Sequence, residues 1–291
     1  MIVLLIFPMI FISLQAMSTK RFQKVAGVTP FFTSFMNLVA SISALIIIVV
    51  LNGFKLRILF SSVILAVIVG IATLIYRLMM VKAMSLGPII IVSIFSFSAS
   101  ALAPFVYGII YLEEPLTILK IIAIILMILS LIPLIRNNSS VKNVHIKFWI
   151  FCVIVFLTAG TNVIFMKQNQ VISPKEYTID FIVLYSIFFA GFSLLNFIFT
   201  VIKTEMREEM QKINKRIVIP CISVGACNTL SNVVSLYLAS RLDASIQFPI
   251  LSSGQIISTA LFSYLLFKEK PSRNTIISVI LSIASIICMA I

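Results

Sequence analysis

The chain has 291 residues, of which 61% are hydrophobic and only 11% are charged, and its mean hydropathy is +1.18. A soluble domain carries about 25% charged residues, so this composition excludes a soluble globular protein, and the lack of Gly-, Pro- or Ser-rich tracts excludes disordered and fibrous classes. The net charge of +13 comes from Lys and Arg in short polar segments between apolar runs, which favours contact with anionic lipid headgroups over binding to nucleic acid.

Ten apolar runs, bounded by charges, prolines or Asn/Ser clusters, follow one another along the chain. Most are about 20 residues long, the length at which a helix crosses a hydrocarbon core of about 30 Å. The runs lack the alternation of outer-membrane strands, so we predict an all-α integral membrane protein with ten transmembrane helices. The predicted helices cover 1–17, 29–51, 61–81, 88–111, 117–135, 148–168, 179–202, 217–239, 245–267 and 274–291.

The first run could be mistaken for a signal peptide. No basic segment precedes it, and Ser18-Thr19-Lys20-Arg21 follow it in place of a small-residue cleavage site, so we expect it to remain as the first span. Between the seventh and eighth runs, residues 203–216 mix basic and acidic side chains. Glu208 and Lys212 lie one helical turn apart there, which predicts a short surface helix.

An internal repeat divides the chain into two halves. Sliding the sequence by 156 positions aligns Glu113-Glu114-Pro115 with Glu269-Lys270-Pro271, and it places Ser96 on Ser252. Each half then holds five spans, and an odd number of spans turns the second half upside down relative to the first. We therefore expect two inverted five-helix repeats, residues 1–136 and 148–291, joined by a linker at 137–147.

The residues around the repeated motif are similar to a known family. Pro104 and the segment from Tyr111 to Thr117, which runs into another apolar span, resemble the closing part of an EamA repeat, and the segment from Phe267 to Pro271 resembles it with basic residues added. Tyr76 to Ala83 resembles the end of that repeat's third helix. The chain thus resembles the EamA-like transporters of the drug/metabolite transporter superfamily over essentially its whole length.

That resemblance implies a ten-helix carrier with a central cavity lined by helices 1, 3, 4, 6, 8 and 9. Members of the family move amino acids, sugars, nucleotide derivatives or drugs. One departure is Asn37, near a position where many members carry Arg. The resemblance therefore implies a transporter and leaves its substrate open.

Polar side chains inside the spans are the candidate substrate-binding residues, because each costs about a few kcal/mol in a bilayer unless it faces the bundle interior or water. Neutral amides and hydroxyls both donate and accept hydrogen bonds, which suits a polar neutral or zwitterionic substrate. The alternative role of each is packing or hydrogen bonding between helices. The candidates are Gln15, Tyr76, Ser96, Ser100, Asn162, Asn228, Asn232, Ser252 and Gln255.

Two further residues are candidates for gating. Arg77 is a charge within an apolar run, and Pro104 frees a backbone carbonyl inside the helix predicted at 88–111. Arg77 lies close to the predicted helix end at 81, so it either snorkels to the headgroups or clamps a substrate carboxylate or phosphate. Glu113 is expected to cap the helix that follows it, where the helix dipole favours negative charge.

The sequence lacks the residues that several kinds of chemistry require. All 9 acidic residues lie in loops or at predicted helix ends, which argues against a proton exchanger built on a membrane-embedded glutamate. The single His145 lies in a loop and the 4 cysteines form no CxxC pair, so we predict no metal site and no cofactor. The sequence holds no HExxH, paired intramembrane aspartates or Ser/His arrangement, so we predict that the protein is not an enzyme.

Together these features predict a secondary transporter that moves a small polar, amino-acid-like metabolite or a drug by alternating access. A lipid-linked flippase is the alternative, followed by an integral-membrane enzyme. We expect a multi-pass protein of the cell membrane, the bacterial cytoplasmic membrane, with a small-molecule substrate, membrane lipids and no nucleic acid as partners; a homodimer stays open. The basic loops place both termini outside the cell, whereas the family resemblance places them inside.

Overall fold

The computed structural model describes residues 2–86, 89–136, 146–174, 177–203, 207–267 and 273–290, and within these ranges all regular structure is helical. The prediction of an all-α protein is confirmed. After a short 3-10 turn at Ile2–Leu5, ten long helices follow, with the short α8 (Arg207–Gln211) before α9. They are α1 (Ile6–Ala26), α2 (Pro30–Leu51), α3 (Phe60–Leu86), α4 (Ile89–Tyr111), α5 (Ile118–Arg136), α6 (Ile146–Ile172), α7 (Thr178–Lys203), α9 (Lys215–Ala239), α10 (Ala244–Phe267) and α11 (Arg273–Ala290).

Local sequence signals fix several helix ends. Gly27 ends α1 with a positive φ of 78°, which a residue with a side chain rarely adopts. Two residues later Thr29 begins α2: its Oγ1 accepts the backbone N–H of Phe32, and Pro30 occupies the first helical position, where its missing N–H is harmless. The Asn214 side chain caps α9 in the same way by accepting from Arg216 N.

The predicted end of the first helix at residue 17 is wrong. α1 continues through the polar segment to Ala26, and within it Thr19 Oγ1 donates to the carbonyl of Gln15 over 3.0 Å. α3 and α6 likewise extend past their predicted ends, to Leu86 and Ile172. The reason is physical: hydropathy marks the part of a helix that suits hydrocarbon, whereas backbone hydrogen bonding continues until a residue such as Gly27 stops it.

The length and composition of the helices identify a multi-pass membrane protein. Six of them are long and apolar enough to cross a membrane, and three shorter apolar helices, Phe95–Tyr111, Ile118–Ser130 and Ile276–Cys288, accompany them in the described part of the chain. Large apolar side chains also cover the outside of the bundle, among them Phe60 (79% exposed) and Ile202 (79%). Such a surface suits lipid, because a helix surrounded by hydrocarbon can carry apolar side chains on all of its faces.

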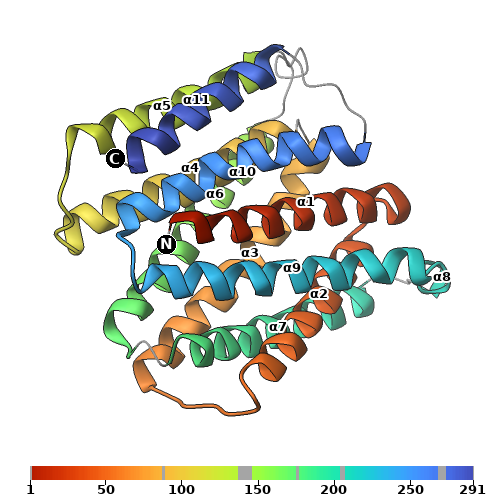
Figure 1. Ribbon diagram of the computed structural model, residues 1–291. Coiled ribbons are helices and arrows are strands. Elements are labelled where there is room, and N and C mark those ends of the chain that lie inside the picture. The colour runs from red at the N-terminus through yellow and green to blue at the C-terminus, as the bar shows by residue number, and fades with distance from the viewer. Residues whose placement is uncertain are drawn as a thin grey trace.

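The helices lie side by side in one bundle, with α5 and α11 along one edge and α2 and α7 near the other (Figure 1). α1 packs against α9 and α10, just as α6 packs against α3 and α4. α2 also packs against α9, as α7 does against α3, and the pairs α2–α7, α4–α10 and α5–α11 are in direct contact. These main contacts are therefore the same when the first five long helices are exchanged in order with the last five.

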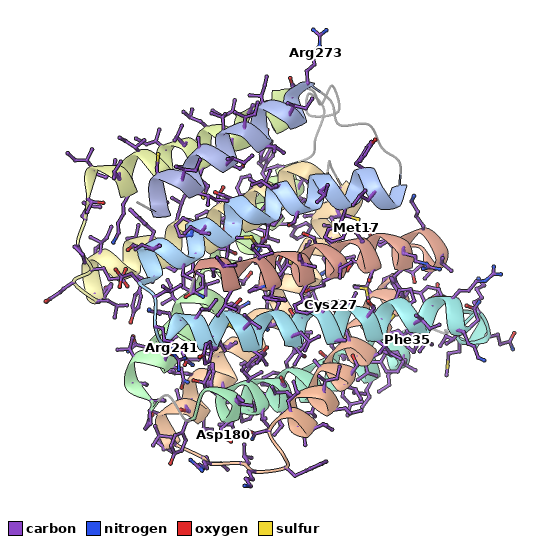
Figure 2. The ribbon with its side chains drawn as sticks, in the orientation of Figure 1. Met17, Phe35, Asp180, Cys227, Arg241 and Arg273 are labelled. Atoms are coloured by element: carbon purple, nitrogen blue, oxygen red, sulfur yellow. The ribbon has the colours of Figure 1, made fainter. Side chains whose placement is uncertain are left out.

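Both described ends of the chain lie on the same side of this bundle (Figure 1). We call this side the terminal face; the α2–α3 loop (52–59), the α4–α5 turn (112–117) and the α9–α10 turn (240–243) also lie on it. Arg241 and Asp180 lie at this face, and Arg273 lies at the far end of the bundle (Figure 2).

Candidate functional site

Arg77 lies well inside α3, which continues to Leu86, and its side chain is half-buried. The observed helix extends beyond the apolar run that ends at 81, so snorkelling and a clamp on a substrate carboxylate or phosphate both stay predictions for Arg77. Its guanidinium carbon is 5.4 Å from the centroid of the Phe189 ring on α7. Tyr76 and Tyr185 are titratable side chains near enough to influence its charge. Arg77 therefore faces the bundle interior among aromatic side chains of α3 and α7.

Two hydrogen bonds between helices extend this group. Tyr76 OH and Ser96 Oγ are 2.8 Å apart, which joins α3 to α4. Asn232 Nδ2 donates to Tyr185 OH over 2.5 Å, which joins α9 to α7. Pairs of side chains from four helices are thus linked in the neighbourhood of this guanidinium. We call this group the central cluster; it consists of Tyr76, Arg77, Ser96, Tyr185, Phe189 and Asn232.

The charge of Arg77 lacks an acidic partner in the described part of the chain. The ion pair recorded there joins Lys120 to Asp243, 3.7 Å apart, and it involves no residue of the central cluster. Among the same residues no group of His, Cys, Asp and Glu side chains could hold a metal ion. A half-buried guanidinium with aromatic and hydroxyl neighbours and no carboxylate is suited to binding the carboxylate or phosphate of a ligand.

The structure brings part of the predicted site together. Tyr76, Ser96, Asn232 and the gating candidate Arg77 belong to the central cluster, and Asn162 of α6 accepts a 3.4 Å hydrogen bond from Thr73 on α3, one turn from Arg77. Tyr185 and Phe189 were not among the predicted residues. An aromatic side chain in an apolar helix is as common against lipid as inside a bundle, so the sequence held no signal that could single them out.

The remaining predicted residues lie outside the central cluster. Ser100 Oγ donates to the Ser96 carbonyl of its own helix over 2.9 Å. Ser252 and Gln255 are buried on α10, 1% and 8% exposed, and Ser252 Oγ has no hydrogen-bond partner among the described residues. Gln15 on α1 and Asn228 on α9 are half-buried, and Pro104 is buried inside α4. Their roles in binding or gating stay predictions.

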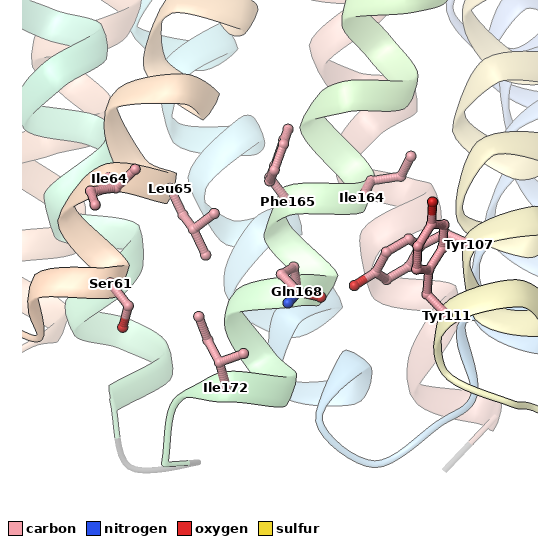
Figure 3. A pocket seen from close by; sticks show the side chains of 9 residues that line it. All are labelled: Ser61, Ile64, Leu65, Tyr107, Tyr111, Ile164, Phe165, Gln168 and Ile172. Atoms are coloured by element: carbon pink, nitrogen blue, oxygen red, sulfur yellow. The ribbon is translucent and has the colours of Figure 1, made fainter.

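A separate hollow of about 460 Å³ lies between α3, α4 and α6 toward the terminal face. Figure 3 shows Gln168 of α6 between the tyrosines of α4 and the apolar side chains of α3. The rings of Tyr107 and Tyr111 stack with centroids 5.3 Å apart. Ile64 and Tyr111 are 49% and 72% exposed, so the hollow opens to the outside of the bundle. Its lining is mainly apolar: Ser61, Ile64, Leu65, Tyr107, Tyr111, Ile164, Phe165, Gln168 and Ile172.

Comparison with known proteins identifies a family match for the second half of the chain. Residues 147–291 match the EamA-like transporter family. A solved structure described only as "Crystal structure of protein" has the same fold, with a TM-score of 0.75 over 98% of this chain and 94% of its own, at 13% sequence identity. No curated protein matches the chain. The second half of the chain thus matches the EamA-like transporter family, and this match is consistent with the drug/metabolite transporter superfamily.

Proposed function

We propose that the protein is a secondary transporter that carries a small polar, amino-acid-like metabolite, or a drug of similar charge, across the bacterial cytoplasmic membrane by alternating access. The observation that carries the proposal is the half-buried Arg77, which has aromatic and hydroxyl neighbours and no carboxylate partner among the described residues. An ionisable residue inside a membrane bundle is rare unless it serves a ligand or a relay. Here the neighbouring groups suit a ligand.

The proposal includes ten transmembrane helices in two inverted repeats, 1–136 and 148–291. The repeated pattern of helix neighbours supports it. Exchanging the halves turns the α1–α9 contact into the α6–α3 contact and α1–α10 into α6–α4, while α2–α7, α4–α10 and α5–α11 map onto themselves. Two halves with equivalent packing can exchange inner and outer openings, which is the basis of alternating access. The linker predicted at 137–147 lies, up to residue 145, outside the described residues.

The chemistry of the central cluster narrows the substrate. A guanidinium presents paired N–H donors that match a carboxylate, while the hydroxyl of Tyr185 and the amide of Asn232 supply acceptors for an ammonium or hydroxyl group. A zwitterionic solute uses both kinds of group. We therefore expect substrates with a free carboxylate to be preferred over their esters or amides.

Uptake of candidate substrates into proteoliposomes tests the expected preference for a free carboxylate. A thermal-shift screen of amino acids and related metabolites on the purified chain would identify ligands, and each ligand would then be assayed for uptake beside its methyl ester. Replacing Arg77 by Gln is expected to lower kcat/KM for the free acid about tenfold or more, because a charge-assisted hydrogen bond contributes about 1.5–3 kcal/mol, and to leave the ester nearly unchanged.

Arg273→Gln is the matched control, since Arg273 is exposed at the far end of the bundle (Figure 2). It should transport like the unaltered protein. A folded Arg77→Gln protein that carries the free acid at the normal rate would contradict the assignment of Arg77 to the substrate.

One observation favours a lipid-linked flippase as the second candidate. The hollow between α3, α4 and α6 is mainly apolar and opens to the side of the bundle, as the passage of an acyl or prenyl chain requires. Replacing Leu65, which lines it, by Trp would fill the hollow. A flippase would then lose translocation of a fluorescent lipid between leaflets, whereas a metabolite carrier would keep its uptake.

A further inference from the structure

A second, polar hollow lies at the terminal face, where the end of α6 meets the α9–α10 turn. Its volume is about 640 Å³, and its polar lining includes the side chains of Lys167, Gln170, Arg241 and Asp243. Figure 2 shows Arg241 at this face of the bundle. The hollow shares no residue with the central cluster or with the apolar hollow of Figure 3.

Lys167 brings a buried cation to this hollow. Its side chain comes from α6 and only 6% of the residue is exposed. Its Nζ donates to the carbonyls of Ala239 and Leu242, each 2.8 Å away, at the end of α9. An ammonium group carries three protons, so one remains beyond the two that these carbonyls accept.

Gln170 contributes an amide N–H donor that has no acceptor among the described residues. The residue is 8% exposed, and its Oε1 accepts a 2.8 Å hydrogen bond from Thr178 Oγ1. Its Nε2 is buried and has no hydrogen-bond partner within the described ranges. Buried donors are nearly always satisfied, so an amide N–H left over beside a cation indicates an acceptor that occupies the hollow.

Two acidic groups, Asp243 and Glu114, lie near enough to Lys167 to favour its charge, and each also has another partner. Asp243 Oδ2 lies 3.7 Å from Lys120 Nζ. Both carboxylate oxygens of Glu114 accept backbone N–H groups at the start of α10, each over 2.8 Å. Counting these two acids against Lys120, Lys167 and Arg241 leaves an excess of one positive charge around the hollow. The local field therefore favours an anion.

We propose that this hollow is a binding site for one oxyanion, a phosphate or carboxylate group held by Lys167 Nζ and Gln170 Nε2. The oxyanion belongs either to a free solute or to the headgroup of an anionic lipid at the membrane surface. The site is distinct from the central cluster, and its existence does not depend on the proposed transport function.

The test measures ligand-induced stabilisation of the full chain. The protein would be placed in phosphatidylcholine nanodiscs, and its unfolding temperature followed while inorganic phosphate replaces chloride at constant ionic strength, because a ligand of the folded state raises the unfolding temperature with concentration. A second series would replace part of the phosphatidylcholine by phosphatidylglycerol. A response to free phosphate identifies a solute site, and a response to phosphatidylglycerol alone identifies a lipid headgroup site.

Gln170→Glu is the decisive variant, since it keeps the oxygen that accepts from Thr178 and replaces the free donor by a repelling carboxylate. We expect it to weaken the apparent affinity about tenfold or more, and Lys167→Gln to do the same if that protein folds. Lys55→Gln, which removes an exposed charge on the same face, should leave it unchanged. No response to phosphate or phosphatidylglycerol, or equal losses in Lys55→Gln and Gln170→Glu, would overturn the proposal.

Discussion

The positive charge of Arg77 lies inside a membrane helix, so neighbouring groups must offset the free-energy cost of removing it from water. A charged side chain near the middle of a membrane helix costs about 2.5–3.5 kcal/mol by insertion measurements. The ring of Phe189, 5.4 Å from the guanidinium carbon, returns about 0.5–2 kcal/mol. The hydroxyl groups of Tyr76 and Tyr185 stabilise the guanidinium less than a fully charged partner would. The compensation is incomplete, and an anionic ligand would complete it.

Tyr185→Phe tests this cluster at the level of one oxygen atom. The ring, 3% exposed, keeps its packing, while Asn232 loses its acceptor and Arg77 a polar neighbour. We expect kcat/KM for uptake to fall several-fold and the stability to fall by no more than about 1 kcal/mol, the usual cost of a hydrogen bond between membrane helices. Tyr264→Phe, at a residue 51% exposed, should change neither quantity. Equal effects of the two variants would argue against a role of the Tyr185 hydroxyl.

Close packing of small residues holds α2 against α9. A Cβ on Gly225 would lie 2.2 Å from the Ala40 carbonyl oxygen and 2.0 Å from Ser43 Oγ, both on α2. Next to it, Thr229 Oγ1 donates to the Gly225 carbonyl over 3.0 Å. Membrane helices gain little from the hydrophobic effect between them, so such close approach supplies the van der Waals contact that keeps them together.

Gly225→Ala is expected to separate these two helices. The nearest obstacle includes backbone, which cannot move aside as a flexible side chain would, so we expect a loss of about 1–3 kcal/mol of stability. Gly191→Ala on α7, where a Cβ would meet nothing within 4 Å, should be neutral or slightly stabilising. The unfolding temperature of each variant in detergent measures the difference, and similar values for both would refute the packing account.

The α9–α10 turn is held by a residue of the other half. Glu114 follows α4, and its two oxygens accept the N–H groups of Ala244 and Ser245, each over 2.8 Å, at the positive end of the α10 dipole. Gly108 is required beside it, because a Cβ there would lie 2.6 Å from Glu114 Oε2. The sequence suggested Glu113 as a cap for the next helix, α5; there Thr117 Oγ1 accepts the Lys120 N–H over 3.3 Å, and Glu114 caps α10.

Replacing Glu114 by Gln should therefore destabilise the protein by about 1–3 kcal/mol, because one of the two N–H groups then faces an amide donor. Glu113→Gln is the control, since Glu113 is exposed and its positive φ of 54° is unchanged by the substitution. Thermal unfolding of both proteins in one detergent gives the comparison. A Glu113→Gln loss as large as that of Glu114→Gln would contradict the cap.

At the scale of the whole molecule, the direction of α10 is decisive for the inverted repeat. α10 has 24 residues, but it is not among the six candidate spans found in the described part of the chain. Arg241 and Arg273 lie on either side of it, at opposite ends of the bundle (Figure 2). If α10 crosses the membrane, these two residues face different compartments.

Labelling of single cysteines tests this crossing. In a cysteine-free background, Arg241→Cys and Arg273→Cys would be exposed to a membrane-impermeant maleimide in intact cells and after permeabilisation. The excess of basic residues at the Arg273 end predicts that Arg241→Cys reacts in intact cells and Arg273→Cys only after permeabilisation. The opposite pattern would reverse the orientation, and labelling of both from one side would exclude the ten-span arrangement.

The sequence by itself determined the class of protein and its helices. Burial in lipid is a local property, because each helix satisfies its own backbone hydrogen bonds, so apolar runs of sufficient length identified all ten long helices before any contact was known. It also identified Tyr76, Arg77, Ser96 and Asn232 as polar groups that hydrocarbon would not tolerate. It misjudged where α1 and α3 end, because hydrogen bonding continues beyond the apolar run.

Only the tertiary structure decided which of these groups meet. Which face a helix turns inward depends on the packing of its neighbours, and contacts such as Asn232 with Tyr185, Lys167 with Ala239 and Glu114 with Ala244 join residues 47, 72 and 130 positions apart. No local pattern encodes those pairings. The aromatic residues Phe189 and Tyr185 became part of the candidate site, and Lys167 and Gln170 came to line a polar hollow, because helices distant in sequence brought them together.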